Sequence, residues 1–173
     1  MRFLTGLVVT AAVCAGGCAA MQPAGPKAVA TLEPRSGSTV SGRVEFRQSS
    51  SGVHLHVELA GLKPGSEHGF HVHDKGDCSA PDAMSTGGHF NPAGAPHGRA
   101  GGAAHHAGDL PSLTADAAGK VRVDLDVAGL TLDPGPTSIV GRSVVVHGDR
   151  DDFTTQPGGN SGARVACGVI GAK

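Results

Sequence analysis

Apolar and polar residues alternate along much of the chain after residue 27, which is the pattern of β-strands with one buried face. Val121, Val123, Leu125 and Val127 give the clearest case. Helical periodicity is nowhere sustained, and turn-forming pairs such as Pro64-Gly65 separate the alternating runs. The pattern predicts an all-β fold, an antiparallel barrel or sandwich. The expected strands are residues 28–33, 39–48, 52–60, 67–73, 109–114, 120–127, 143–147 and 163–170.

Two segments do not fit this pattern, residues 74–106 and 148–162, which are rich in glycine and proline. An unstructured loop of more than about 15 residues inside a small domain is usually functional. Histidines are concentrated in the first of these segments, so metal ligation is the function that we expect for it. A disordered glycine-rich linker is the alternative, but it gives no reason for the histidines.

The length of 173 residues and the hydrophobic content of 39% predict one domain with a real core. The formal net charge is −1, and the chain has no block of lysine and arginine. Phosphate binding requires clustered basic residues, so nucleic acid is excluded as the expected partner.

The first residues resemble an export signal, with Arg2 before the apolar run from Phe3 to Val13 and small residues after it. The run is too short to span a bilayer, and a buried core helix is the alternative. We therefore expect residues 1–17 to be an export signal. The mature protein would then lie in the periplasm or cell envelope.

The end of this signal resembles that of a bacterial lipoprotein, because Ala15-Gly16-Gly17 precedes Cys18. Cys18 would become the lipidated first residue, and this anchor would be the only contact with the membrane. Ordinary cleavage after Ala20 is the alternative. Residues 18–27 mix proline, glycine and small residues and are expected to form a flexible tether, which leaves residues 28–173 as the folded domain.

Two of the four cysteines, Cys14 and Cys18, lie in the processed segment, so Cys78 and Cys167 remain. In an oxidising compartment, two remaining cysteines are expected to form one disulfide. Zinc ligation by the two thiols is the alternative, but the histidines already supply enough ligands.

The histidine spacing is typical of a metal centre. His71 and His73 are two residues apart at the end of an expected strand, so both rings lie on one face and can share an ion. His147 ends another expected strand and could complete the set. Imidazole is a common ligand of copper and zinc, and one carboxylate among imidazoles suits zinc. The further candidates are His89, His97, His106 and Asp109.

Not every histidine is a candidate ligand. His54 and His56 have the same spacing as His71 and His73, but they lie opposite the apolar face of their strand and no other ligands cluster near them in sequence. They are expected to face solvent, with adventitious metal binding as the alternative. His68 and His105 have no assigned role.

Five sequence strings, in register, resemble the copper–zinc superoxide dismutase family, and in particular its exported bacterial branch. The resemblance covers nearly all of the chain after the tether and implies an eight-stranded Greek-key barrel with two long metal-site loops. The strings are Gly69-Phe70-His71-Val72-His73, Gly76-Asp77-Cys78, Gly88-His89-Phe90-Asn91-Pro92, His106-Ala107-Gly108-Asp109-Leu110 and Gly162-Ala163-Arg164-Val165-Ala166-Cys167-Gly168-Val169-Ile170.

The resemblance also implies the ligands of one copper and one zinc ion per subunit, with His89 bridging the two as an imidazolate. Asp151 would accept hydrogen bonds from the outer nitrogens of His71 and His97, although the adjacent Asp152 is an alternative for this role. The implied copper ligands are His71, His73, His89 and His147. The implied zinc ligands are His89, His97, His106 and Asp109.

The implied activity is the disproportionation of superoxide, in which copper cycles between two oxidation states and His89 transfers a proton. Arg164 would orient the anion beside copper, so the implied catalytic residues are Arg164 and His89. The 148–162 loop lacks an obvious Glu and Lys pair for steering the substrate. Lys75, Arg99 and Arg150 are the candidates for this steering.

Two other functions are compatible with a metal centre. A copper-handling protein without turnover would be expected to lack a copper ligand or Arg164, and a two-zinc hydrolase usually has bridging carboxylates. The oligomeric state is expected to be monomer or homodimer, since the chain has no Trp or Tyr, residues that are often found at interfaces.

Overall fold

Ten β-strands and one turn of 3-10 helix form the regular structure of residues 25–173, the part of the chain that this computed structural model describes. No α-helix occurs in this part. The elements are β1 (Lys27–Pro34), β2 (Ser41–Ser49), β3 (Gly52–Ala60), β4 (Glu67–His68), β5 (Phe70–His73), η1 (Met84–Thr86), β6 (Leu113–Thr114), β7 (Val121–Val127), β8 (Ser143–His147), β9 (Arg164–Val169) and β10 (Gly171–Ala172).

The expected export signal, Cys18 and residues 18–24 of the expected tether lie outside the described residues. Within residues 25–173, no helix is long and apolar enough to cross a membrane.

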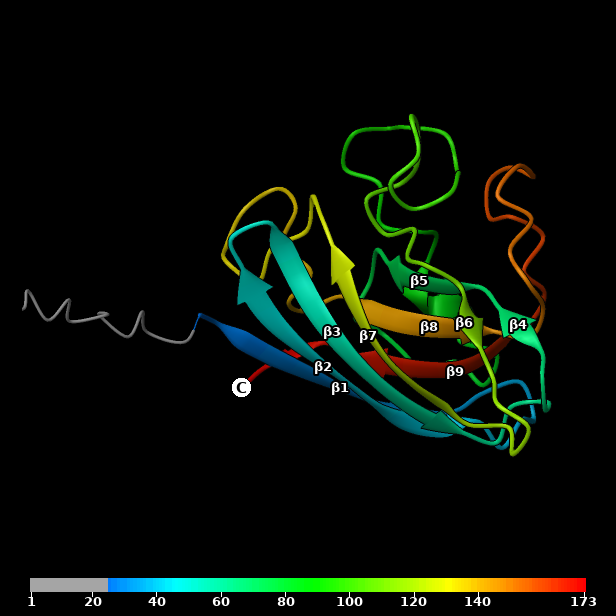
Figure 1. The fold of residues 1–173 in the computed structure, drawn as a ribbon. Helices are drawn as coiled ribbons and strands as arrows, with labels where there is room; N and C mark the ends of the chain where they lie inside the picture. Colours follow the sequence, from blue (N-terminus) through cyan, green and yellow to red (C-terminus); the bar gives the residue numbers. More distant parts are fainter. Residues whose placement is uncertain (1–24) are drawn as a thin grey trace, which may run out of the picture.

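The strands form one curled antiparallel sheet in the order β5-β8-β9-β1-β2-β3-β7, with β10 beside β1 (Figure 1). The chain passes from β3, next to one end of this order, to β5 at the other end, and it returns from β7, the end strand beside β3, to β8 beside β5. These two crossings give the Greek-key connection, and β4 pairs with β6 in a second, short sheet. The structure confirms the predicted all-β antiparallel fold.

Two predicted strands are wrong in their extent. The predicted strand 67–73 is divided at Gly69, whose backbone N–H donates to Asp149 in the 148–162 loop at 2.9 Å. The predicted strand 109–114 is reduced to β6, because Asp109 forms only an isolated bridge with His71. In both places the backbone is held by a long loop or by the metal-site residues instead of by a continuous strand neighbour.

The two faces of β5 are both buried, for different reasons. Phe70 and Val72 point into the main hydrophobic core. His71 and His73 alternate with them and so point out of the barrel, yet their exposed fractions are only 0% and 1%. Figure 1 shows the two long loops, β5–β6 in green and β8–β9 in orange, on the side of the barrel formed by β5 and β8. These loops shield the two imidazoles from water.

The disulfide between Cys78 and Cys167 joins the loop after β5 to β9, with the two Cα atoms 5.8 Å apart. This confirms the predicted pairing and rules out the alternative of zinc ligation by these two thiols. Cys167 and Val145 form a small apolar cluster with Ala83 on the outer side of the sheet.

The disulfide closes a loop of 89 residues in the unfolded chain. Replacing both Cys78 and Cys167 by Ser is therefore expected to lower the free energy of unfolding by about 4–5 kcal/mol, the loop-closure entropy for such a length. Urea unfolding of the metal-free oxidised protein and of the double variant measures this difference, with reduced wild-type protein as the control. Equal unfolding free energies for all three would contradict the prediction.

Candidate metal centre

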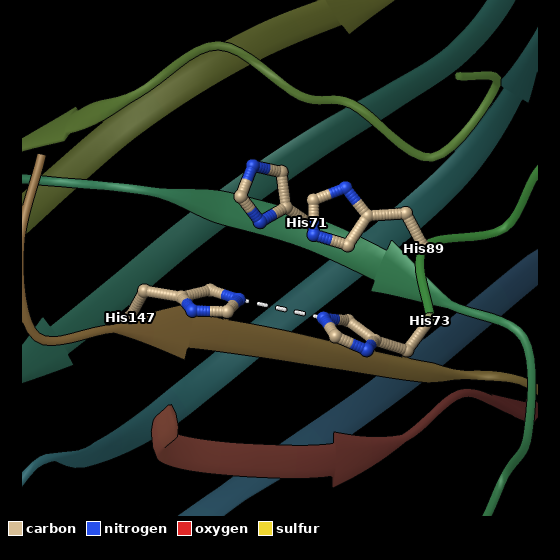
Figure 2. A group of neighbouring side chains, drawn as sticks. All are labelled: His71, His73, His89 and His147. Carbon is tan, nitrogen blue, oxygen red and sulfur yellow. Dashed lines mark hydrogen bonds between the residues drawn. The ribbon is translucent and has the colours of Figure 1, made fainter. Parts of the chain in front are cut away.

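Two groups of potential metal ligands share one residue, His89. In each group the ligand atoms all lie within 4.8 Å of one another. Figure 2 shows the first group, with His71 and His73 projecting from β5, His147 from the end of β8 and His89 from the loop. The first group is His71, His73, His89 and His147. The second group is His89, His97, His106 and Asp109.

The pairing of β5 with β8 aligns the strand histidines of the first group. His73 lies opposite Ser143, and the register of β8 with β9 shifts between Val146 and His147. The Nε2 atoms of His73 and His147 are 3.4 Å apart, as the dashed line in Figure 2 marks. Val165 of β9 is skipped in this register, which makes a β-bulge beside His147.

The 74–106 loop is attached to β5 through Val72, which accepts a hydrogen bond from the Phe90 backbone N–H and donates one to the Gly108 carbonyl, each at 2.8 Å. A Cβ on Gly108 would be 2.3 Å from the Val72 carbonyl oxygen, so only glycine permits this approach. The adjacent residues His89 and Asp109 are thereby placed beside the strand histidines.

Asp109 is at the centre of the second group. Its Oδ1 is 2.8 Å from His89 Nδ1, 3.1 Å from His97 Nδ1 and 3.2 Å from His106 Nδ1. Burial raises the pKa of Asp109, but hydrogen bonds from His89 and from two backbone amides outweigh burial and hold this pKa well below its usual range. A carboxylate ion surrounded by three imidazole nitrogens is a typical donor set for tetrahedral zinc.

Three imidazoles of the first group, those of His71, His73 and His147, are held in the neutral form. Burial, followed by repulsion from His89, lowers the pKa of His71 and of His73 well below 6.5 and lowers that of His147 to about 4. The Nδ1 atom of His71 is buried and has no hydrogen-bond partner among the described residues. Such an atom costs about 1–3 kcal/mol unless something binds it. A metal ion that accepts nitrogen ligands fits this unpaired lone pair.

Asp151 joins the two groups. Its Oδ2 accepts a hydrogen bond from His71 Nε2 at 2.8 Å, and its Oδ1 accepts one from His97 Nε2 at 2.9 Å. Asp152, the alternative considered from the sequence, instead bonds Thr154 and Thr155 at the surface. The contacts of Asp151 fix which nitrogen of each ring carries the proton, and so which nitrogen is free to bind a metal.

Sequence reasoning missed a second contact that holds His97. The Gln156 side chain accepts a hydrogen bond from the His97 backbone N–H at 2.8 Å and donates one to the His97 carbonyl at 3.0 Å. Arg99 also stacks on Phe153, with its guanidinium carbon 3.8 Å from the ring centre. These contacts join the two long loops. No sequence pattern indicates them, because they depend on residues more than 50 positions apart.

The remaining histidines lie outside both groups. His54 and His56 are about one third exposed and bond Asp126 and Asp124 on β7, at 2.9 and 2.8 Å. His68 is buried and its Nδ1 is 2.8 Å from the carbonyl oxygen of His147, so it links β4 to the end of β8.

A cleft of about 700 Å³ opens at the first group, and its walls include His89, His147 and Arg164. Arg164 Nη1 donates hydrogen bonds to the Ala83 carbonyl at 2.9 Å and to Thr86 Oγ1 at 2.7 Å. Arg164 is the only lysine or arginine among the described residues that line the cleft. The steering candidates Lys75, Arg99 and Arg150 do not line it.

Fold and site together define a β-barrel with a histidine-rich centre that could hold two metal ions. The sequence profile of copper/zinc superoxide dismutases matches residues 40–170. The chain belongs to the copper/zinc superoxide dismutase family.

Individual relatives support this assignment over most of the domain. The chain is 42% identical over 145 residues to superoxide dismutase [Cu-Zn] of Deinococcus radiodurans, covering 77% of this chain and 78% of that one. It is 40% identical over 144 residues to superoxide dismutase-like protein YojM of Bacillus subtilis, covering 80% and 73%. A solved double mutant of a superoxide dismutase-like protein from Bacillus subtilis has a TM-score of 0.74 and 41% identity, covering 81% and 94%.

The lowered histidine pKa values predict how pH affects the metal-free protein. Between pH 6.5 and about 4, the unfolded chain binds a proton at His147 that the folded chain does not bind. The free energy of unfolding should therefore fall as pH falls through this window, by roughly 3 kcal/mol from His147 alone. Urea unfolding of metal-free protein at several pH values measures the effect.

Two variants make this test specific. His147→Gln should show a shallower loss of stability on acidification, whereas His105→Gln, outside both ligand groups, should behave as wild type. Stability that is constant from pH 7 to pH 4.5 in the wild-type protein would show that these imidazoles are not held neutral.

Proposed function

We propose that this protein disproportionates superoxide, converting two superoxide ions and two protons into oxygen and hydrogen peroxide. The observation that carries the proposal is that His89 belongs to both ligand groups. Its Nδ1 faces Asp109, so its Nε2 is left for the first group. The ring of His89 lies between the two metal positions. A residue placed in this way can bind the metal that transfers the electron and can also carry a proton.

The donor chemistry of each group suits a different ion. Four imidazole nitrogens fit copper, and three nitrogens with one carboxylate fit zinc. We propose that His71, His73, His89 and His147 hold copper and that His89, His97, His106 and Asp109 hold zinc. When bound, copper supplies the one-electron redox change and zinc supplies a fixed positive charge.

The chain's own residues then have three tasks. Asp151 orients the rings of His71 and His97 through its two hydrogen bonds. His89 holds a proton at Nε2 in one half of the cycle and releases it to the reduced product in the other. Gly158 lies beside this atom, and both His89 and Gly158 line the cleft from which a small anion would approach.

Arg164 supplies the positive charge that a small anion needs for binding. Its guanidinium lies in the wall of the cleft beside the first group, and two hydrogen bonds from Nη1 hold it there. A fixed guanidinium next to an open ligand position attracts and orients a small anion. We propose that Arg164 and His89 are the two residues that act directly on superoxide.

A copper-handling role without turnover is the second candidate, because some relatives are named superoxide dismutase-like. Such a protein would be expected to lack a ligand or the arginine, and this chain has a histidine or aspartate at every implied ligand position and Arg164 in the cleft. A two-zinc hydrolase is less consistent with the site, since its shared ligand is an imidazole and not a carboxylate.

We also propose that the protein works in the periplasm or cell envelope. The disulfide between Cys78 and Cys167 supports an oxidising compartment. An export signal over residues 1–17 and a lipid anchor at Cys18 would deliver it there, with residues 18–27 as a tether to the domain at 28–173. Mass spectrometry of the mature N-terminus tests this part of the proposal.

Replacing Arg164 by Ala tests the proposed function. The variant is expected to keep both metals and to lose about 10-fold or more in kcat/KM for superoxide, with the largest loss at low ionic strength, because screening weakens charge attraction. Pulse radiolysis measures this rate. Arg150→Ala, which lies outside the cleft wall, is the matched control and should behave as wild type. Fully metallated wild-type protein that does not accelerate superoxide decay would contradict the proposed activity.

A further inference from the structure

Thr86 stands between the proposed copper ligands and the proposed anion-binding arginine. It is the last residue of η1, it is completely buried, and its Oγ1 lies 2.7 Å from Arg164 Nη1 and 3.2 Å from His73 Nδ1. No other side chain among the described residues makes hydrogen bonds to both Arg164 and His73.

The hydrogen bonds of this hydroxyl are fully used. A threonine hydroxyl has one proton to donate and two lone pairs that accept. Thr86 donates to the Ala83 carbonyl at 2.9 Å, and its two lone pairs are left for Arg164 Nη1–H and His73 Nδ1–H. The Ala83 carbonyl also accepts directly from Arg164 Nη1 at 2.9 Å. Arg164 is therefore held by the Thr86 hydroxyl and by the Ala83 carbonyl, and these two groups are hydrogen-bonded to each other.

The same hydroxyl affects the copper side of the site. Because Nδ1 of His73 donates to Thr86 and to the Gly87 carbonyl at 3.0 Å, the lone pair of this ring is at Nε2. Nε2 is the atom that faces His147 within the first ligand group. A partner on the outer nitrogen sets the tautomer and the orientation of a ligating histidine.

We propose that Thr86 is a positioning residue that couples His73 to Arg164, so that the guanidinium is held in a fixed orientation toward an anion bound at the copper position. This inference rests on the proposed function. Thr86 touches neither the cleft nor the anion, and it acts through Arg164.

Azide is a suitable probe, since it is a small anion whose binding to cupric ion is followed by a charge-transfer absorption band. Thr86→Val keeps the shape of the side chain and removes its hydrogen bonds. In protein loaded with copper and zinc, this variant is expected to keep its metal content and to bind azide about three- to tenfold more weakly, the scale of one ordinary hydrogen bond. Thr86→Ser, which keeps the hydroxyl, should restore the wild-type affinity.

A double-variant cycle tests whether the effect passes through Arg164. In the Arg164→Ala background, Thr86→Val should cause no further loss of azide affinity, because the group that Thr86 positions is gone. Thr154→Val is the control, since the Thr154 hydroxyl bonds Asp152 and Thr154 does not line the cleft; its azide affinity should be unchanged. If Thr86→Val does not fold, Thr86→Ala replaces it in the cycle.

The outcomes separate this inference from the function on which it rests. Equal azide affinity in wild type and Thr86→Val, with the cupric signal intact in both, would overturn the role of Thr86 and leave the proposed function standing. An equal loss from Thr86→Val with and without Arg164 would also overturn it, because the effect would then be a general loosening of the site. Wild-type protein that holds no copper would end both proposals.

Discussion

A cluster of nitrogen lone pairs is largely buried beside the barrel, and the rest of the structure depends on it. His71 is fully buried, its Nε2 bonds Asp151, and its Nδ1 has no partner among the described residues. Neutral imidazoles packed this closely do not satisfy one another, so a bound ion is the simplest way to satisfy them. A bound ion would therefore stabilise the site, and the two long loops enclose it.

These loops have little regular structure, and side-chain contacts replace backbone ladders in holding them. Asp151 bonds one histidine from β5 and one from the 74–106 loop, and so connects three segments. Gln156 bonds the backbone of His97, and the disulfide at Cys78 attaches the loop to β9. Loop order and metal binding should therefore be coupled, as in sites where binding free energy is also folding free energy.

The placement of Arg164 follows from the same attachment. It begins β9, three residues before Cys167, and its Nη1 bonds the turn at Ala83 that packs against the disulfide. The arginine, the disulfide and the turn form one unit that borders the cleft. A charge held in this way needs little rearrangement when an anion arrives, which is the property expected of an orienting group.

Much of the fold can be predicted from residue alternation alone, because strands such as β3 and β7 bury one face against a single core. The division of the predicted strand at Gly69 could not be predicted, since it depends on Asp149 in a distant loop. The candidate ligands could be named from spacing and family resemblance, and the structure brings them together. The choice of Asp151 over Asp152 required contacts, because adjacent carboxylates look alike in sequence. The hydrogen bonds of Thr86 with His73 and Arg164 could not be predicted, because no residue pattern in the sequence indicates them.

We have proposed that a copper ion and a zinc ion share the ring of His89. Metal analysis of the purified mature protein, combined with its electron paramagnetic resonance spectrum, determines which ions the two groups hold. We expect one copper and one zinc ion per chain, with a cupric signal typical of nitrogen ligands. Two zinc ions per chain with no cupric signal, or a single ion of either kind at full occupancy, would contradict it.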